Sequence, residues 1–153
     1  MTQEDKQLLL KDLCARLPYG VICHYNCVTP IEGRELRKAN CKDVLKGIIP
    51  ASDGHIGFMV GFDKVNALEG DIKPYLRPLS SMTEDERKEL KEEHKKDERI
   101  YAEVIERIAN GDEHARGTAV PHFAADWCNK NHFDYRGLIE KGLALEAPKR
   151  CVR

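Results

Sequence analysis

The chain has 153 residues, with 25 Lys or Arg against 26 Asp or Glu, so its formal net charge is only -1. That balance argues against a protein that coats nucleic acid with its whole surface, because such proteins carry a strong basic excess. No apolar run approaches the roughly 20 residues that span a bilayer, and the first residues are acidic before they are apolar, unlike a secretory signal. We therefore predict a cytoplasmic protein with no membrane association, folded as a single domain over residues 1–153.

The six cysteines, at positions 14, 23, 27, 41, 128 and 151, bear on the compartment. An even number indicates a disulfide framework when a chain is secreted and too small for an ordinary core. This chain lacks a secretory signal and is long enough to bury a core. We therefore predict reduced thiols, most of them buried, in a reducing cytosol.

The first predicted element is a helix over residues 2–17. Thr2 and Asp5 have the spacing of a capping box, in which each side chain accepts a hydrogen bond from the other residue's backbone N–H. Leucines then recur at three- and four-residue steps and give the helix one apolar stripe. Pro18-Tyr19-Gly20 ends the helix, because proline removes a backbone donor and glycine tolerates the turn. The opposite, polar face carries Glu4, Lys11 and Asp12.

The region over residues 20–79 is predicted to be rich in strands. Apolar and polar residues alternate from Val21 to Val28 and again from His55 to Lys64. The polar stretch from Pro30 to Asn40 fits either a short edge strand or a loop, and Ile72–Leu76 is a weaker strand candidate. About four to six short strands in such a span indicate a small antiparallel sheet or a partly closed barrel.

The region over residues 83–145 is predicted to be helical. Thr83 and Glu86 form a second capping box at the start of a long helix. The segment from Glu84 to Arg99 is almost entirely charged, whereas Ile100–Ile108 carries an apolar stripe. Two further helices are predicted, over Pro121–Lys130 and from Asp134 to Ile139.

Together these elements predict an α+β fold: an N-terminal helix, a small antiparallel sheet or partly closed barrel, then a long helix and short C-terminal helices. The helices before and after the sheet are expected to cover its apolar face. The predicted core consists of Leu9, Leu13, Leu17, Ile56, Phe58, Val60, Phe62, Leu76, Val104, Ile108, Phe123 and Trp127.

Two pairs of soft ligands raise the question of a metal. Cys23 and Cys27 are four residues apart, as are Cys128 and His132. Zinc needs its ligands in one tetrahedron, but residues four apart in a strand lie roughly 13 Å from each other. Core thiols are therefore the better interpretation. We predict no metal and no cofactor, and a zinc-dependent enzyme is only a remote alternative.

Nucleophilic catalysis has a similarly weak basis. His114, His122, Asp126 and Cys128 are close in the sequence, and a Cys–His pair with a carboxylate is a known arrangement. However, no local signature surrounds Cys128, which follows Trp127 on the side of a helix that is expected to pack, where a thiol is usually inert. We predict a non-enzymatic protein with no catalytic residue.

Nucleic-acid or nucleotide binding is the alternative function that the strand-rich region suggests. Lys73, Tyr75 and Arg77 alternate in the segment framed by prolines, and Arg37 and Lys42 lie upstream. Small curled sheets bind nucleic acid on an open face that combines aromatic and cationic residues. The objection is that the phenylalanines of the clearest strand are assigned to the core, which leaves that face without them.

Protein binding is the leading prediction for function. In the charged segment Glu84–Arg99 the only large apolar residue is Leu90, and His94 follows four residues later. We predict that Leu90 and His94 form a thin exposed line that pairs with a host or phage protein, or with a second copy of the chain in an antiparallel dimer.

Three stretches of the sequence also resemble a known group of proteins. IKPYLRPLSSMTEDE in the middle, KQLLLKDLCARLPYGV at the start and NKNHFDYRGLIEKGLALEAP at the end are similar to uncharacterised small proteins from prophages and mobile elements of gut bacteria. The resemblance covers a third of the chain. It implies a phage-type, cytoplasmic accessory role and transfers no catalytic or binding residue.

Overall fold

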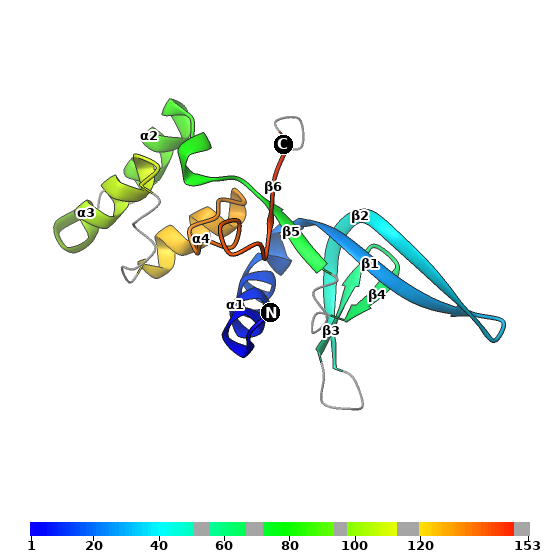
Figure 1. Cartoon of the computed structure of the whole chain (residues 1–153). Coiled ribbons are helices and arrows are strands. Elements are labelled where there is room, and N and C mark those ends of the chain that lie inside the picture. The colour runs from blue at the N-terminus through cyan, green and yellow to red at the C-terminus, as the bar shows by residue number, and fades with distance from the viewer. Residues whose placement is uncertain (51–55, 67–71, 94–97, 113–119, 149–153) are drawn as a thin grey trace. The chain divides into compact units, whose positions relative to one another are not determined.

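The computed structural model describes residues 1–50, 56–66, 72–93, 98–112 and 120–148 (Figure 1). Contacts within the chain form two compact units. Unit 1 comprises Met1–Tyr75 and Gly142–Leu145, and unit 2 comprises Leu76–Lys141 and Glu146–Arg153. These units are defined by contacts within the chain, and the single domain expected from the sequence stays a prediction. The α+β fold class is confirmed, because the described residues form four α-helices and an open six-stranded sheet.

Unit 1 begins with the predicted helix, α1 (Gln3–Arg16), which is followed by a 3-10 turn, η1 (Leu17–Tyr19). The capping box is present: the Asp5 N–H donates to Thr2 Oγ1 at 3.1 Å, and the Thr2 N–H donates to Asp5 Oδ2 at 3.0 Å. Gly20 then adopts a φ of 65°, which ends the helical segment as expected.

The strands of the sheet are β1 (Ile22–Ile31), β2 (Arg34–Pro50), β3 (Ile56–Val60), β4 (Asp63–Asn66), β5 (Ile72–Leu76) and β6 (Leu145–Glu146). Their order is β4-β3-β2-β1-β5-β6, and the pairs β1/β2, β1/β5, β2/β3 and β3/β4 are antiparallel. Strands β1 to β4 therefore pair in chain order, β5 joins the sheet on the other side of β1, and β1 and β2 are the central strands.

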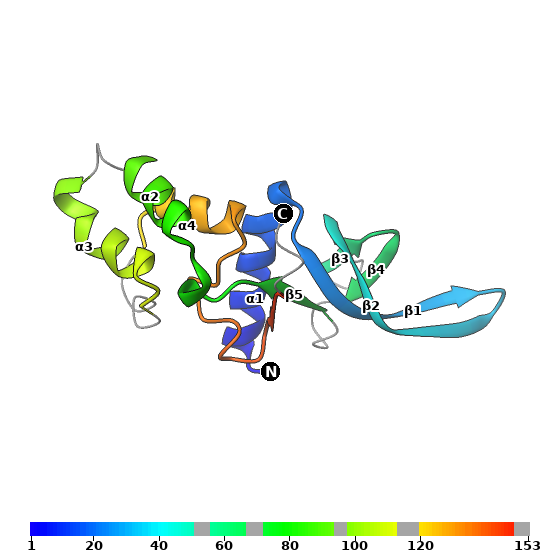
Figure 2. The same cartoon turned by 90° about the horizontal axis from the view of Figure 1, so that it is seen from above.

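The ambiguous polar stretch after Pro30 is part of the longest hairpin of the sheet. Glu32 and Gly33 form its two-residue loop with φ angles of 50° and 77°, the backbone of a type I′ turn. The register shifts between Tyr25 and Cys27, so β2 has one extra residue at its bulge, where Asn40 has a φ of 56°. Figures 1 and 2 show that the end of this hairpin extends beyond β3 and β4.

A second tight hairpin replaces the continuous strand predicted over His55–Lys64. β3 ends at Val60 and β4 begins at Asp63, so Gly61 and Phe62 form a two-residue loop. Gly61 takes a φ of 60°, which suits a loop with glycine at its first position. The chain reverses there, and Phe62 is 91% exposed, so its assignment to the core is wrong.

The core of unit 1 lies on one face of the sheet, the face to which the odd-numbered residues of β1 from Cys23 to Cys27 point. Cys23, Tyr25 and Cys27 are buried, as are Phe58 and Val60 of β3. Ile56 is half-buried. Leu9 and Leu13 of α1, with Leu45, Val65 and Ile72 of the strands, are also buried.

Unit 2 contains a short 3-10 turn, η3 (Leu79–Ser81), and the helices α2 (Glu84–Glu93), α3 (Glu98–Ala109) and α4 (His122–Lys130). The second capping box is present, with the Thr83 N–H donating to Glu86 Oε2 at 2.8 Å and the Glu86 N–H donating to Thr83 Oγ1 at 3.3 Å. None of the helices in the described ranges is long and apolar enough to cross a membrane.

Instead of one long helix after Thr83, the structure has two helices that pack on each other. Lys91 Nζ of α2 lies 2.8 Å from Glu106 Oε2 of α3. In one continuous helix, residues this far apart in sequence would be separated by about 22 Å along the axis. α2 and α3 are therefore two separate helices that lie against each other.

The core of unit 2 collects apolar side chains from all three helices and the segment after α4. Trp127 of α4 stacks on Phe133 with their ring centroids 5.6 Å apart. The predicted core residues Leu76, Ile108 and Trp127 are buried, whereas Val104 and Phe123, like Leu17 in unit 1, are half-buried. The buried cluster contains Leu79, Met82, Leu90, Ile105, Ile108, Ala109, Ala124, Trp127, Cys128, Phe133 and Tyr135.

The last predicted helix, from Asp134 to Ile139, is a series of turns in the structure. The buried Asp134 carboxylate nevertheless acts as a cap, because it accepts hydrogen bonds from the Leu138 and Ile139 N–H groups, both at 2.8 Å. Gly137, with a φ of 75°, stops these turns from continuing as a helix.

Candidate nucleic-acid interface

Three neighbouring strands of unit 1 align two lysines and a histidine across the sheet. His24 of β1 lies directly opposite Lys42 of β2 and, on its other side, opposite Lys73 of β5. Residues that are directly opposite in a sheet point to the same face. The flanking residues Cys23 and Tyr25 are buried, so this row lies on the face away from the core, which we call the outer face.

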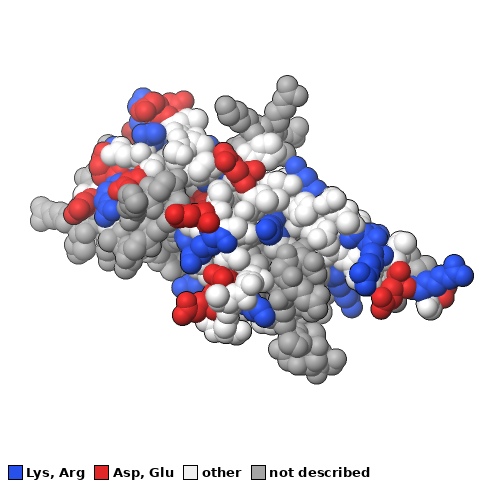
Figure 3. All heavy atoms as spheres, viewed as in Figure 1, with Lys and Arg blue, Asp and Glu red and all other residues white. Residues whose placement is uncertain are grey.

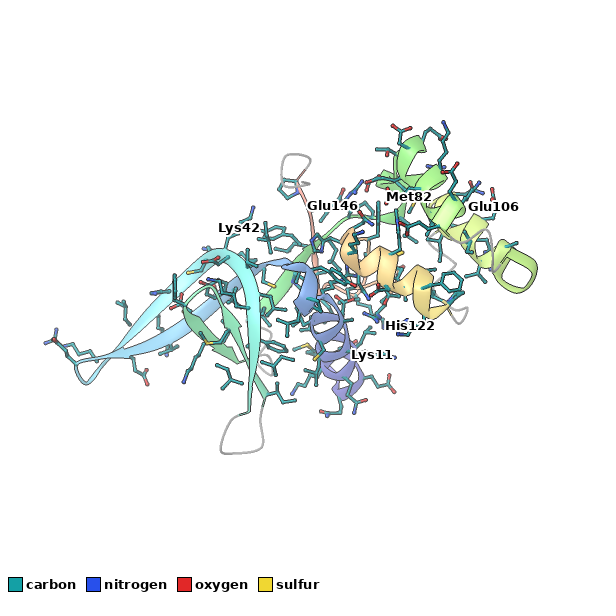
Figure 4. All side chains as sticks on the ribbon, turned by 180° about the vertical axis from the view of Figure 1, so that it is seen from behind. Lys11, Lys42, Met82, Glu106, His122 and Glu146 are labelled. Atoms are coloured by element: carbon teal, nitrogen blue, oxygen red, sulfur yellow. The ribbon has the colours of Figure 1, made fainter. Side chains whose placement is uncertain are left out.

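Two aromatic rings stand beside lysines of the outer face. Lys42 Nζ lies 4.8 Å from the centroid of the Tyr75 ring, and Lys46 Nζ lies 4.5 Å from the centroid of the Phe62 ring. Both distances are within the range of cation–π attraction. Figure 4 labels Lys42 near the crest of the curve in β2. We call Lys42, Lys46, Lys73, Phe62 and Tyr75 the cation–aromatic face.

The rows that surround His24 add no negative charge. From Ile22 to Asn26 of β1, and at the positions beside them in β2 and β5, the outward side chains are apolar, amide, imidazole, ammonium or phenol. The nearest outward carboxylate in these strands is Glu35, further along the hairpin opposite Pro30. Lys42 and Lys46 are exposed, and Lys73 and Tyr75 are half-buried. The result is a local positive surface on a chain whose total charge is close to zero. The outward positions around His24 are Ile22, His24, Asn26, Asn40, Lys42, Val44, Lys73 and Tyr75.

The bulge in β2 fixes one border of this surface. Asn40 donates its N–H to Asn26 Oδ1 at 2.9 Å, and Asn40 Oδ1 lies 3.3 Å from His24 Nε2. These contacts tie β1 to β2 where the regular ladder is interrupted. The imidazole at the centre of the row is therefore held by a neighbour on the same face.

On the opposite face, a polar clasp holds β4 against the β1–β2 hairpin. The Tyr25 hydroxyl donates to Asp63 Oδ2 at 2.9 Å, and Lys38 Nζ donates to Asp63 Oδ1 at 2.9 Å. Hydrogen bonds from Lys38 and then from Tyr25 hold the pKa of Asp63 below its ordinary value of 3.8. Burial and the Asp63 hydrogen bond raise the pKa of Tyr25. The clasp positions the β3–β4 loop that carries Phe62.

The clasp predicts an acid-dependent loss of stability. Because the pKa of Asp63 is lowered in the folded state, its contribution is fully present above its ordinary pKa and is lost as pH falls through the folded-state pKa. Asp63→Asn is therefore expected to flatten the pH dependence of the urea unfolding midpoint below pH 3.8. Glu4→Gln, at an exposed site in α1 of the same unit, is the control. An unchanged pH profile in Asp63→Asn would contradict the role of the clasp.

The nucleic-acid residues predicted from the sequence separate into three groups. Lys42, Lys73 and Tyr75 come together on the outer face. Arg37 is exposed near the end of the hairpin, and its partner across β1 is Val28. Arg77 belongs to unit 2 and is only 8% exposed, so its prediction as a binding residue is wrong.

Arg77 has a structural role instead. Its guanidinium donates to both Glu86 carboxylate oxygens, at 2.6 and 2.9 Å, and lies 4.2 Å from the centroid of the Phe133 ring. Burial alone raises the pKa of Glu86, but the hydrogen bonds from Arg77 and Thr83 outweigh it and leave that pKa lowered. A planar guanidinium that is paired with a carboxylate through both terminal nitrogens and stacked on a ring is a packing element and not a free phosphate ligand.

The predicted protein-binding line of Leu90 and His94 does not form as expected. Leu90 is completely buried in the core of unit 2, so its assignment to an exposed surface is wrong. The packing of α2 on α3 brings other apolar side chains over it, and these are distant in sequence. His94 lies outside the described residues.

The weak metal candidates are dispersed. Cys23 and Cys27 belong to unit 1, whereas Cys128 and His132 belong to unit 2. Burial, and then the Asp12 charge, raise the pKa of Cys23 to about 12, so this thiol is protonated at neutral pH. The described ranges hold no group of three or more His, Cys, Asp or Glu residues arranged to bind a metal. The five described cysteines, at 14, 23, 27, 41 and 128, form no disulfide.

Two members of the cation–aromatic face were missed at the level of sequence: Lys46 and Phe62. The sequence does contain a signal for Phe62, because a glycine followed by one other residue, here Gly61-Phe62, is a typical two-residue hairpin loop. Lys46 carried no such signal, because its place on the outer face depends on the strand register. Comparisons of the chain with protein-family models, with curated proteins and with solved structures find no match.

Proposed function

We propose that this protein binds single-stranded nucleic acid on the cation–aromatic face of unit 1. The phosphates would contact Lys42, Lys46 and Lys73, and unstacked bases would stack on Phe62 and Tyr75. The observation that carries the proposal is the position of Phe62. Phe62 belongs to a two-residue loop and is 91% exposed, and the Lys46 ammonium lies 4.5 Å from the centroid of its ring.

The arrangement favours single strands over duplexes for a physical reason. A base stacks on an aromatic side chain only when its own face is free, and each such contact contributes about 1–3 kcal/mol. The two-residue loop fixes the backbone at Phe62, so stacking has to order only the few side-chain torsions of the ring. The adjacent lysines supply positive charges to the phosphates of the flexible nucleic-acid strand.

The near-zero net charge of the chain sets the expected strength and salt response. Attraction is limited to the few lysines of one face, so binding should be moderate at physiological salt. Each phosphate contact on a single strand contributes about 0.7 to the slope of log K against log salt. Three lysine contacts therefore predict a slope of about −2.

The contribution of stacking is tested by Phe62→Ala. Removal of the ring is expected to weaken binding of a labelled oligothymidylate by about 5- to 150-fold, which corresponds to 1–3 kcal/mol. Fluorescence anisotropy measures the affinity. The matched control is Ile48→Ala, because Ile48 is also exposed on β2 but lies opposite the inward-facing Phe58. Equal affinities for Phe62→Ala and the unmodified protein would exclude Phe62 as a stacking platform.

The contribution of charge is tested by replacing Lys42 and Lys73 together with alanine. The loss of two phosphate contacts is expected to reduce the salt slope by about 1.4 and to weaken binding equally across sequences. A control with the same change in charge replaces Lys88 and Lys130, which are exposed in the helices of unit 2. If both double variants lose the same affinity, the binding surface is not the cation–aromatic face.

The phage-type accessory role that the sequence resemblance implies stays a prediction. A protein that sequesters single strands fits such a role as well as one that binds a host protein. Leu90 offers no surface for protein binding, because its side chain is buried in the unit 2 core.

A further inference from the structure

The end of the β1–β2 hairpin has one open edge. β5 pairs with β1 only at Cys23–Tyr25, and β3 pairs with β2 only from Leu45 onward. Within the described part of the chain, no strand pairs with the outer edge of β2 over residues 34–38. The outer edge of β1 is protected here, because Pro30 has no N–H to offer a further strand.

The hairpin loop determines which backbone groups of β2 face that open edge. In a two-residue hairpin, the residues that flank the loop form a hydrogen-bonded pair, and the pairs then alternate. Ile31 and Arg34 flank this loop, so the next pair, Pro30 and Glu35, is not hydrogen-bonded. The N–H and C=O groups of Glu35, and likewise of Arg37, therefore point outward, away from β1.

The side chains at these positions select one partner and one register. An antiparallel neighbour must bring its own outward residues opposite Glu35 and Arg37. If that neighbour is the same segment, pairing centred on Leu36 places each Glu35 opposite an Arg37. In the two neighbouring antiparallel registers, which are centred on Glu35 or on Arg37, that residue would lie opposite its own copy. Two like charges directly opposite each other are unfavourable.

We propose that a second copy of this chain pairs with the open edge of β2, antiparallel and centred on Leu36. Leu36 is 49% exposed in the free chain and would meet its own copy in a non-hydrogen-bonded pair, where side chains are closest. Figure 3 shows both signs of charge on this end of the hairpin. This inference does not rest on nucleic-acid binding, since it uses a different segment and a different readout.

The proposed contact is short, so the dimer should be weak and sensitive to salt. In the same register, Arg34 would lie opposite Lys38 of the second copy, a pair of like charges. The Lys38 ammonium is already engaged by Asp63 at 2.9 Å, which reduces its repulsion. Glu35 and Arg37, both exposed, supply the two symmetric ion pairs that set the register.

Charge exchange tests the register directly in sedimentation equilibrium at low salt. Glu35→Arg and Arg37→Glu each replace both symmetric attractions by repulsions, so each is expected to weaken dimerisation about tenfold. The double variant Glu35→Arg/Arg37→Glu restores opposite charges and should dimerise like the unmodified chain. A protein whose mass shows no dependence on concentration overturns the proposal, as does a double variant that fails to recover.

A second measurement uses covalent trapping of the full chain. Leu36→Cys should form a disulfide between the two copies of residue 36, identified by mass spectrometry of the linked peptides. The control is Val28→Cys, because Val28 is equally exposed, at 50%, but lies on β1, away from the proposed two-fold axis. Linkage at 36 well above linkage at 28 supports the pairing, and equal linkage at both positions overturns it.

Discussion

Leu90→Asp is expected to unfold unit 2. Leu90 has no exposed surface and packs in the cluster that includes Ile105, Ile108 and Trp127. Truncation of a buried leucine alone costs about 2–5 kcal/mol, and the carboxylate adds the cost of an uncompensated buried charge. The total approaches the stability of a typical domain, about 5–15 kcal/mol.

The measurement is chemical denaturation followed by tryptophan fluorescence. Trp127 is the only tryptophan of the chain and lies 3% exposed in the unit 2 core, so its emission reports on this unit. Lys88→Asp, an exposed site in the same helix, is the control for introducing an aspartate. A Leu90→Asp protein with an unchanged unfolding midpoint would contradict the packing of α2 on α3.

Arg16→Met is expected to destabilise unit 1 by about 3–5 kcal/mol. Arg16 Nε and Asp12 Oδ2 lie 2.8 Å apart, and both side chains have no exposed surface. The substitution leaves the buried Asp12 carboxylate without the guanidinium that offsets its desolvation. The apolar methionine occupies a similar volume, so the loss reports on charge more than on packing.

Hydrogen-exchange mass spectrometry of β1 and β2 peptides measures this effect in unit 1. The double variant Asp12→Leu/Arg16→Met is the matched control, because replacing both partners by apolar residues is often neutral or stabilising. The double variant is therefore expected to recover most of the protection that Arg16→Met loses. Equal protection in Arg16→Met and the unmodified protein would contradict a coupled buried pair.

Local signals in the sequence predicted local structure well. Both capping boxes form, because the groups of a capping box are only three residues apart. The alternation from Val21 to Val28 correctly indicated that Cys23 is buried. By contrast, the sequence pattern predicts Asp12 on the polar face of its helix, because helical periodicity does not reveal that Asp12 and Arg16, one turn later, are buried together.

Errors arose where a turn or a distant contact decides the outcome. Phe62 follows the alternation of a strand, but Gly61 reverses the chain one residue earlier. Leu90 is isolated among charges in its own helix, and the side chains that bury it come from elements far along the sequence. The row of Lys42, His24 and Lys73 depends on the register of three strands, including the bulge in β2. No single segment of the sequence determines such pairing between distant strands.

The correction of Phe62 changes the balance between the candidate functions. As a core residue it argued against binding on the sheet, but as an exposed ring beside Lys46 it supports binding there. Arg77 changes in the opposite direction, from a candidate phosphate ligand to a buried partner of Glu86. The proposed site is therefore a surface of unit 1 that includes Lys73 and Tyr75 of the segment framed by prolines but not Arg77.

The most direct test of the central claim is a fluorescence-anisotropy titration of the unmodified protein against a labelled single-stranded oligonucleotide at several salt concentrations. The proposed cation–aromatic face predicts saturable binding at low salt, with a slope of log K against log salt of about −2. It also predicts weaker binding to a duplex of the same sequence, whose bases are already stacked. No binding at low salt, or tighter binding to the duplex, would contradict the account.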